Sequence, residues 1–339
     1  MMKQSARHFA IRAALEAIAA TNPRAIVRRM AAHSVIFTLH HVRPASDEAF
    51  APNAGLSVQP DFLDEAIEEC TACNFTPIRL SDLPARLAAE PHGRFVAFTL
   101  DDGCRDNRDH AAPVFRRHGV PYTLFVTKGF AQRTQTMWWE TAEAAIRQVE
   151  RWVLDGEAMD CSTLADKTAA FRRTAALVDG SEDETRAVAA VEAAAQAAGV
   201  DGKEIVKREA MDEAELTTLS KDDPFAEFGV HTLTHSALAK LSGDAMRREI
   251  DQSIDWITEL TGKRPVSVAY PYGHPWACGS REAAAADEAG LSVGVTTQPG
   301  KIVVAPAAPL LLPRVSLNGL YQEPRFVRAF LSGRLLKTA

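Results

Sequence analysis

The sequence predicts an α/β fold in which helices cover both faces of a parallel sheet. Two observations lead to this fold class. Short apolar runs rich in β-branched residues alternate along the chain with segments of helical periodicity, and parallel strands need such helical crossovers. The chain is also long, with 339 residues, of which 46% are hydrophobic and 24% are charged. It is therefore globular, and it has room either for two domains or for one α/β barrel with a large insertion.

The alternating elements can be placed one by one along the chain. Helices are expected over residues 61–74 and 107–118. A longer helix is expected to begin at a cap on Ser236 and to run to about Leu260. The predicted strands are the apolar runs between these segments, at residues 34–39, 94–100, 122–126, 227–231, 266–270 and 291–297.

Two parts of the chain lie outside this alternation. From about residue 130 to 220 the sequence is rich in Ala, Glu and Asp, with helical periodicity and no clear strand. We therefore expect a helical insertion in this stretch. Residues 3–31 are also expected to be helical, because they combine Ala-rich stretches with regularly recurring arginines.

The charge of the chain limits the class of partner. The formal net charge is −6, which argues against a nucleic-acid-binding protein dominated by phosphate contacts. Basic residues nevertheless gather near both ends, in residues 325–337 and at Arg7, Arg12, Arg24, Arg28 and Arg29. Such termini fit either a weak association with an anionic membrane surface or an ordinary solvated face.

The compartment can also be predicted. No run of about 18 apolar residues is present, so no transmembrane span is expected. The apolar stretch over residues 8–20 is interrupted by Arg12 and Glu16, which a secretory signal would not contain. The five cysteines are an odd number and fit reduced thiols better than a disulfide framework. We therefore expect a cytoplasmic protein.

Two predicted strands end in potential metal ligands. Asp101 and Asp102 follow one strand, and His231 and His235 follow another. Parallel α/β folds build their sites at the carboxyl ends of strands. Two imidazoles with three residues between them match a metal-ligand spacing, and with Asp102 they would form a set of two histidines and one carboxylate. The alternatives are that the aspartates cap a turn and that the histidines are structural.

A third strand end carries the sequence YPYG at residues 270–273. Pro271 restricts the residue before it, and Gly273 permits a sharp turn. Such a turn can direct a backbone N–H group into a cleft, although the same four residues also suit a plain turn.

In this order, TLDDG, HTLTH and YPYG resemble the motifs of the NodB-type polysaccharide deacetylases of carbohydrate esterase family 4. The segments LHHV, PYT and LPRV, at residues 39–42, 121–123 and 312–315, also have counterparts in bacterial members. The resemblance implies a distorted (β/α) barrel, commonly of seven strands. The domain expected at residues 34–339 is then one barrel, interrupted at about 130–220 and preceded by a helical segment at 1–33.

The resemblance also implies a reaction. Family members remove N-acetyl groups, and in some cases O-acetyl groups, from amino sugars of glycans such as chitooligosaccharides or of glycolipid and oligosaccharide precursors. Asp101 would be the catalytic base that activates a metal-bound water. Asp102, His231 and His235 would bind a divalent metal, most often zinc, with cobalt or nickel as alternatives. The backbone N–H of Tyr272 would stabilise the oxyanion.

Two positions depart from the family pattern. The third motif often carries an arginine that orients the base, but here Tyr270 stands before the proline, so Arg314 becomes the candidate, with an ordinary salt bridge as the alternative. The late histidine that protonates the leaving amine is also missing. His40, at the end of the first predicted strand, is the candidate proton donor, with His41 and His274 as alternatives.

Trp138 and Trp139 open the predicted insertion and are candidates for stacking on sugar rings, or else for packing in the core of the insertion. Two other function classes stay open. A metal-dependent phosphoester hydrolase also uses Asp and His ligands, although such sites often hold two metal ions about 3.5–4 Å apart. A glycan-binding pseudoenzyme would fit the missing late histidine.

Overall fold

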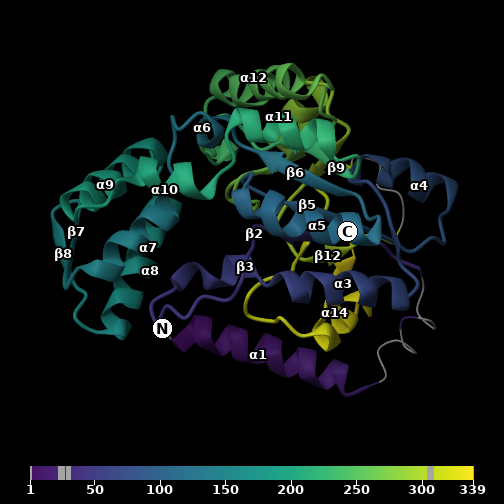
Figure 1. The fold of residues 1–339 in the computed structure, drawn as a ribbon, viewed down its shortest axis with the longest axis horizontal. Coiled ribbons are helices and arrows are strands. Elements are labelled where there is room, and N and C mark those ends of the chain that lie inside the picture. Colours follow the sequence, from purple (N-terminus) through teal and green to yellow (C-terminus); the bar gives the residue numbers. More distant parts are fainter. Residues whose placement is uncertain (1, 22–26, 28–31, 304–308, 339) are drawn as a thin grey trace.

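A parallel sheet that curves into a distorted barrel forms the centre of the protein (Figure 1). The computed structural model describes residues 2–21, 27, 32–303 and 309–338. Along the sheet the strand order is β11-β10-β9-β6-β5-β1-β13, with β4 beside β5. These strands are β1 (Val35–Leu39), β4 (Thr76–Pro77), β5 (Phe95–Leu100), β6 (Tyr122–Val126), β9 (Ala226–Val230), β10 (Ser267–Ala269), β11 (Val293–Val295) and β13 (Val315–Ser316).

The segment before β13 connects the two ends of this sheet. The backbone N–H of Leu312 donates to the carbonyl of Gly294 at 2.8 Å, and the N–H of Thr296 donates to the carbonyl of Leu312 at 2.9 Å. A few residues later, β13 pairs in parallel with β1. The segment therefore lies between the edge strand β11 and β1. The α/β class and the seven-stranded barrel-like path are confirmed.

All six predicted strands are present within two residues of their expected bounds. The neighbouring strands β6, β5 and β1 are buried along their whole length, as expected for strands covered by helices on both faces. The helices that cover the sheet are α3 (Pro60–Ala72), α4 (Leu83–Ala89), α5 (Ala112–His118), α12 (Gly243–Thr261), α13 (Ser280–Glu288) and α14 (Pro324–Leu331).

Short elements complete the barrel domain. The first turns of the predicted helix at 107–118 form a π-helical segment that continues directly into α5. The short elements are η1 (Pro52–Leu56), η2 (Leu80–Asp82), η3 (Asn107–Ala111), η4 (Leu238–Lys240), β2 (His41–Val42), β3 (Ser57–Val58), β12 (Gly300–Lys301) and β14 (Lys337–Thr338).

The long helix α12 begins later than its sequence predicts. Its cap is Ser242, whose hydroxyl accepts a hydrogen bond from the N–H of Ala245 at 3.3 Å. The expected cap, Ser236, instead bonds through its hydroxyl to the hydroxyl of Thr234 at 2.8 Å. The prediction was wrong because the residues between the strand and the helix form an irregular loop, in which Ser236 has a local partner.

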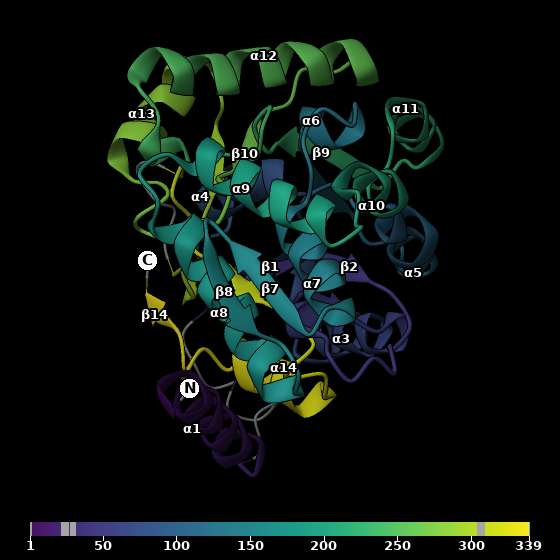
Figure 2. The same ribbon diagram turned by 90° about the vertical axis from the view of Figure 1, so that its left-hand side faces the viewer.

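The insertion packs beside the barrel (Figure 1), so it lies in front of the sheet when the molecule is seen from that side (Figure 2). It has its own hydrophobic core. Trp152 is 1% exposed in this core, and its Nε1–H donates to the hydroxyl of Thr174 at 3.0 Å. Between β6 and β9 the elements are α6 (Lys128–Ala131), α7 (Trp138–Gln148), β7 (Arg151–Leu154), β8 (Glu157–Asp160), α8 (Leu164–Gly180), α9 (Glu184–Ala197), α10 (Gly202–Glu209) and α11 (Glu213–Asp222).

The expectation that this stretch contains no strand was wrong. Strands β7 and β8 form an antiparallel hairpin around Asp155 and Gly156, which have φ values of 51° and 80°. A two-residue Asp-Gly turn with positive φ at both residues is a strong local signal for a hairpin. This turn lies within a stretch of otherwise helical composition. The prediction missed it because it was based on the periodicity of the whole stretch from about residue 130 to 220.

The N-terminal helix α1 (Met2–Ala19) packs on α14, and most of the rest of the helical segment expected to reach residue 31, at residues 22–26 and 28–31, lies outside the described residues. Arg24, Arg28 and Arg29 lie outside the described residues, as does the side chain of Arg7. Three other basic residues near the termini are paired with acids, through the ion pairs Arg12–Glu323, Arg325–Glu16 and Arg328–Glu69.

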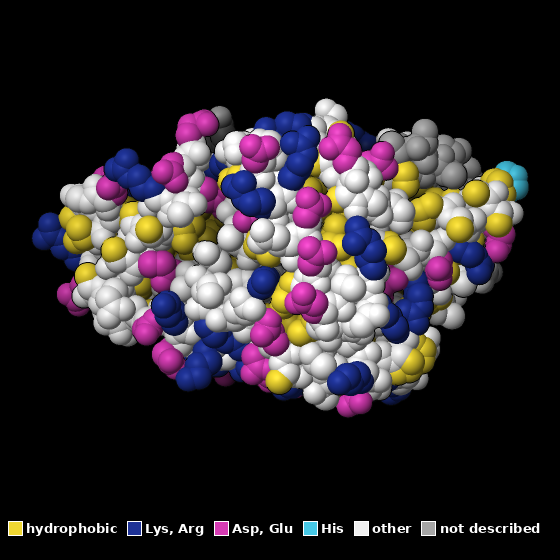
Figure 3. Space-filling model, turned by 90° about the horizontal axis from the view of Figure 1, so that it is seen from above, with side chains coloured by type: hydrophobic (Ala, Val, Ile, Leu, Met, Phe, Trp, Pro, Cys, Tyr) yellow, Lys and Arg dark blue, Asp and Glu magenta, His cyan; other side chains and the backbone are white. Residues whose placement is uncertain are grey.

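The surface seen from above carries acidic and basic side chains that are interspersed over the outer helices (Figure 3). Among the described residues, no helix combines the length and the apolar character needed to cross a membrane.

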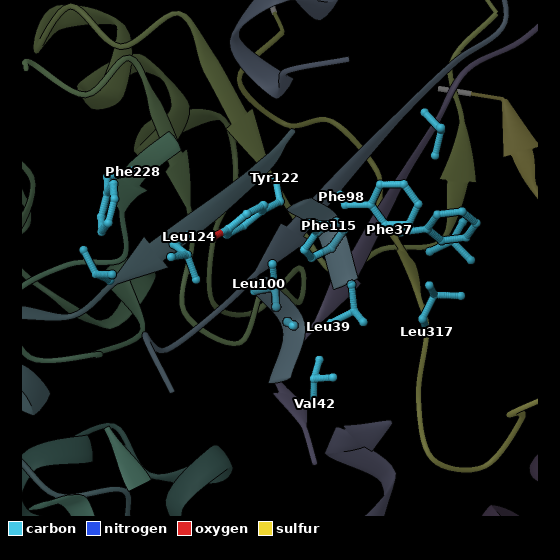
Figure 4. Close-up of a cluster of buried hydrophobic side chains, with 14 of the residues drawn as sticks. Phe37, Leu39, Val42, Phe98, Leu100, Phe115, Tyr122, Leu124, Phe228 and Leu317 are labelled. Carbon is cyan, nitrogen blue, oxygen red and sulfur yellow. The ribbon is translucent and has the colours of Figure 1, made fainter. Parts of the chain in front are cut away.

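Aromatic side chains fill the space between the central strands and α5 (Figure 4). The rings of Phe115 and Tyr122 are stacked with their centroids 4.6 Å apart, and Phe98 meets Phe115 edge-on at 5.5 Å. Phe115 and Tyr122 are at most 1% exposed. Such pairs add to the free energy gained from burying the rings.

We expect the substitution Phe115→Ala to lower the free energy of unfolding by about 3–5 kcal/mol, because it leaves a cavity in this aromatic cluster. Chemical denaturation followed by circular dichroism measures the change. The matched control is Phe9→Ala, since Phe9 on α1 is 77% exposed and its loss should change stability by less than about 0.5 kcal/mol. Equal effects of the two substitutions would contradict the described core.

Candidate active site

The carboxyl ends of neighbouring strands bring the predicted site residues together. His40 follows β1, Asp101 follows β5, His231 follows β9, and Tyr272 lies in the loop after β10. These strands run parallel in one sheet, so their ends meet at the same edge. There they surround a cavity of about 430 Å³, whose lining includes eight of the nine predicted site residues: His40, Asp101, Asp102, Trp138, Trp139, His231, His235 and Tyr272. The ninth, Arg314, lies behind this wall.

Three of these residues form a candidate metal centre. The Oδ1 atom of Asp102 lies 3.3 Å from the Nε2 atom of His231 and 3.3 Å from the Nε2 atom of His235. Ligands placed tetrahedrally about 2.0–2.2 Å from a zinc ion lie roughly 3.4 Å from one another. The spacing of the three atoms therefore fits a bound divalent cation.

The protonation of His231 supports the same conclusion. Its Nδ1 atom is 2.7 Å from the carbonyl oxygen of Ala269, which fixes the ring proton on Nδ1 and leaves a lone pair on Nε2. This lone pair faces Asp102 Oδ1, a buried oxygen with no hydrogen-bond partner. In the neutral imidazole the two atoms both present lone pairs, and a metal ion or a proton between them would make the contact favourable. Burial alone would raise the pKa of Asp102, but the two imidazoles hold it well below its usual value.

The loops that carry the ligands are held in uncommon conformations. Asp102, Thr232, His235 and Tyr272 all have φ between 61° and 72°, a left-handed region that non-glycine residues rarely adopt. Contacts from outside the loops stabilise them. The carboxylate of Glu249 on α12 accepts hydrogen bonds from the N–H groups of residues 233 and 234 and from the hydroxyl of residue 234, at 2.7–3.0 Å.

Arg314 and Asp101 form a buried ion pair. Arg314 Nη1 donates to Asp101 Oδ1 and Nη2 donates to Oδ2, each at 2.7 Å. The same guanidinium donates to the carbonyl of Thr296 at 2.9 Å and to the hydroxyl of Thr99 at 3.0 Å. Burial by itself would raise the pKa of Asp101, but the adjacent guanidinium holds it below its usual value. Asp101 is therefore an ionised carboxylate at neutral pH.

The three candidate proton donors are placed differently. His40 lines the cavity, and its carbonyl accepts a hydrogen bond from Asn107 Nδ2 at 2.6 Å. Burial lowers the pKa of His40, although Asp102 and Asp101 oppose this effect. His274 lines the exposed rim of the cavity. His41 does not line it, and its Nδ1 atom lies 2.6 Å from the carboxylate of Asp106.

The two tryptophans belong both to the cavity wall and to the core of the insertion. Trp138 is 6% exposed and Trp139 is 8% exposed, and both pack in the hydrophobic cluster of the insertion. The indole N–H of Trp138 donates to the hydroxyl of Tyr272 at 3.2 Å. The ring centroid of Trp139 lies 5.1 Å from that of His235. Packing in the core of the insertion, one of the two expectations for these tryptophans, therefore does not prevent them from lining the cavity, as the other expectation requires.

Sequence reasoning missed three residues that support the site, namely Glu184, Glu249 and Asn107. Each is polar and lies outside the three motifs, within a stretch that reads as ordinary helix. Only the spacing between the histidine motif and α12 could have suggested Glu249, and no local pattern identifies Glu184. Their partners are fixed by tertiary contacts alone.

The family of the chain follows from a comparison of sequences. A model of the polysaccharide deacetylase family matches residues 88–170 and 182–293, more than half of the chain. The chain therefore belongs to the polysaccharide deacetylase family. This membership supports glycan deacetylation, a hydrolase activity, as the class of reaction. A comparison with curated protein sequences found no match.

Solved structures of deacetylases share the fold. They include the deacetylase PplD of Streptococcus pyogenes in complex with acetate, IcaB of Ammonifex degensii and a de-N-acetylase of Aggregatibacter actinomycetemcomitans. The TM-scores are 0.59, 0.54 and 0.55, at sequence identities of 16%, 16% and 9%. The alignments cover 89%, 89% and 88% of this chain and 99%, 97% and 99% of the other chains. At such identities the similarity concerns the fold alone.

The geometry of the candidate metal centre leads to a prediction about the stoichiometry of zinc binding and its dependence on Asp102. We expect chelator-treated protein to bind one equivalent of Zn²⁺ in this centre, and Asp102→Ala to abolish that binding, because it removes the oxygen that faces both imidazoles. Competition with a zinc-binding dye measures the affinity. Substitution of the exposed Asp47 by Ala serves as the control and should leave the affinity unchanged. Unaltered zinc affinity in Asp102→Ala would place the metal elsewhere.

Proposed function

We propose that this protein removes N-acetyl groups, with O-acetyl groups as the alternative, from amino sugars of a glycan or of an oligosaccharide or glycolipid precursor, and that zinc is its cofactor. Cobalt and nickel are the alternative metals, and chitooligosaccharides are a suitable model substrate. The observation that carries the proposal is the presence, in one cavity, of a buried ionised carboxylate beside a set of three metal ligands.

Asp102, His231 and His235 would hold the cation in this proposal. A bound zinc ion supplies Lewis-acid chemistry, because it lowers the pKa of water and polarises an acyl oxygen. An amide is a weak electrophile, so its hydrolysis needs both effects. The remaining tasks, which are to move protons and to orient the acetyl group, fall to other residues of the chain.

Asp101 is suited to take the proton of the attacking water. A base must be ionised and correctly oriented before the reaction, and the two hydrogen bonds from Arg314 provide both conditions. Arg314 is thus a positioning residue in the proposal. It takes the place of the arginine that the third motif of this family often carries.

Two further groups would act on the acetamide, one when water attacks its carbonyl carbon and the other when its C–N bond breaks. The backbone N–H of Tyr272 would stabilise the negative charge that develops on the acetyl oxygen. His40 would give a proton to the departing amine, since it lines the cavity while His41 does not. Trp138 and Trp139 would contact the sugar ring from the side of the insertion.

Acetate release tests the proposed activity. We expect the zinc- or cobalt-loaded protein to release acetate from at least one member of a panel of N-acetylated glycans. Asp101→Asn should lower this rate by about 10²–10⁴-fold, because the base is lost. Asp47→Asn is the matched control, since Asp47 is an exposed aspartate away from the cavity. The proposal would be contradicted if the wild type released no acetate from any glycan, or if Asp101→Asn released acetate at the same rate as the wild type.

The role of His40 can be separated from a general loss of activity. An amine leaves only when it is protonated, whereas an aryl oxide leaves without a proton. We therefore expect His40→Ala to lower the hydrolysis of an N-acetylated glycan by about 10²–10⁴-fold and to change aryl acetate hydrolysis far less. His274→Ala tests the alternative donor. An equal loss on both substrates would show that His40 is not the proton donor.

A further inference from the structure

The turn between α8 and α9 connects the insertion to the edge of the catalytic cavity. Lys240, which follows the histidine motif, donates from its Nζ to the carbonyl of Asp179 at 2.8 Å. Asp179 itself lines the cavity. Five residues further on, Glu184 begins α9 with a side chain that is 9% exposed. This buried carboxylate has no place in the proposed reaction, yet it lies against two of the three motifs.

Each oxygen of Glu184 binds a different catalytic loop. Oε1 accepts the hydroxyl proton of Tyr272 at 2.7 Å. Oε2 accepts the backbone N–H of Ala237 at 2.9 Å, two residues beyond the candidate metal ligand His235. The hydroxyl of Tyr272 also accepts the indole N–H of Trp138 at 3.2 Å, so its orientation is fixed from both sides.

This bridge supports loops that are strained in themselves. Tyr272 and His235 have φ values of 62° and 61°. Non-glycine residues persist in this region only where surrounding contacts hold them there. An ionised acceptor forms stronger hydrogen bonds than a neutral one. Since one carboxylate restrains both loops, a change at Glu184 should affect both loops together.

We propose that Glu184 is a positioning residue for both motifs, which sets the direction of the Tyr272 backbone N–H and the location of His235. The insertion thus completes the catalytic cavity instead of only covering it. The part that concerns Tyr272 rests on the proposed function. The part that concerns His235 rests only on the metal centre and can be tested without a substrate.

The first test compares Glu184→Ala and Glu184→Gln with Glu182→Ala, which removes an exposed carboxylate from the same turn. Loss of a group that supports a metal ligand typically weakens metal affinity 10–100-fold. We therefore expect Glu184→Ala to weaken zinc binding by at least 10-fold, with a smaller loss in Glu184→Gln, which keeps one acceptor oxygen. Glu182→Ala should bind zinc like the wild type.

The second test separates the two loops. Tyr272→Phe removes the hydroxyl but keeps the backbone N–H and the contact between Glu184 and Ala237. We expect this substitution to leave zinc affinity unchanged and to lower kcat about 10-fold at nearly constant KM, which is less than the 10²–10³-fold cost of removing an oxyanion donor. Glu184→Ala should lower kcat at least as much, and combining it with Tyr272→Phe should add little further loss.

The proposal is overturned if Glu184→Ala and Glu184→Gln fold with a lower Tm but keep the zinc affinity and the kcat of the wild type within twofold, because Glu184 would then be only structural. If Glu184→Ala does not fold, Glu184→Gln is compared with Tyr272→Phe instead. Wild-type zinc affinity and kcat in Glu184→Gln would then overturn the proposal, and a loss of zinc affinity that Tyr272→Phe does not show would support it. If the wild type releases no acetate, the proposed function fails, and the zinc affinities alone still confirm or overturn the role of Glu184 at His235.

Discussion

The buried ion pair of Asp101 and Arg314 is the interaction on which the site and the closure of the barrel both depend. A carboxylate taken out of water is costly unless a counter-charge and hydrogen bonds accompany it. Arg314 supplies two hydrogen bonds to Asp101, and two of its other N–H groups bind the carbonyl of Thr296 and the hydroxyl of Thr99. Because Arg314 lies in the segment between β11 and β1, the charge of the candidate base is stabilised only when that segment is in place. The fold and the charge of the candidate base therefore depend on the same contact.

The candidate metal ligands pose the opposite electrostatic problem. Asp102 Oδ1 and the lone pair of a neutral His231 Nε2 repel each other unless a metal ion or a proton lies between them, and strained loops hold them in that arrangement. Carboxylates from outside the loops provide the restraint: Glu249 comes from α12 and Glu184 comes from the insertion. The loops of the candidate site are thus held by two carboxylates outside the set of candidate ligands, and the insertion contributes one of them.

Much of the fold could be predicted because it depends on local patterns. The apolar runs that become β5 and β6 are buried on both sides, so their composition alone identifies them. Predictions failed where one contact outweighed the average pattern. The Asp155–Gly156 turn creates a hairpin within a helical composition, and Ser236 bonds to Thr234 instead of capping α12.

The sequence by itself determined where the strands lie along the chain, which strand ends carry Asp101, Asp102, His231 and His235, and the resemblance to a family that the comparison of sequences confirmed. Only the tertiary structure decided which residues meet them. Arg314 is 213 residues from Asp101, and Glu184 is 88 residues from Tyr272. Likewise, His40 lines the cavity, whereas the neighbouring His41 binds Asp106. The physical reason is that periodicity and turn preferences act over a few residues, whereas the partner of a buried charge is set by how distant strands and helices pack.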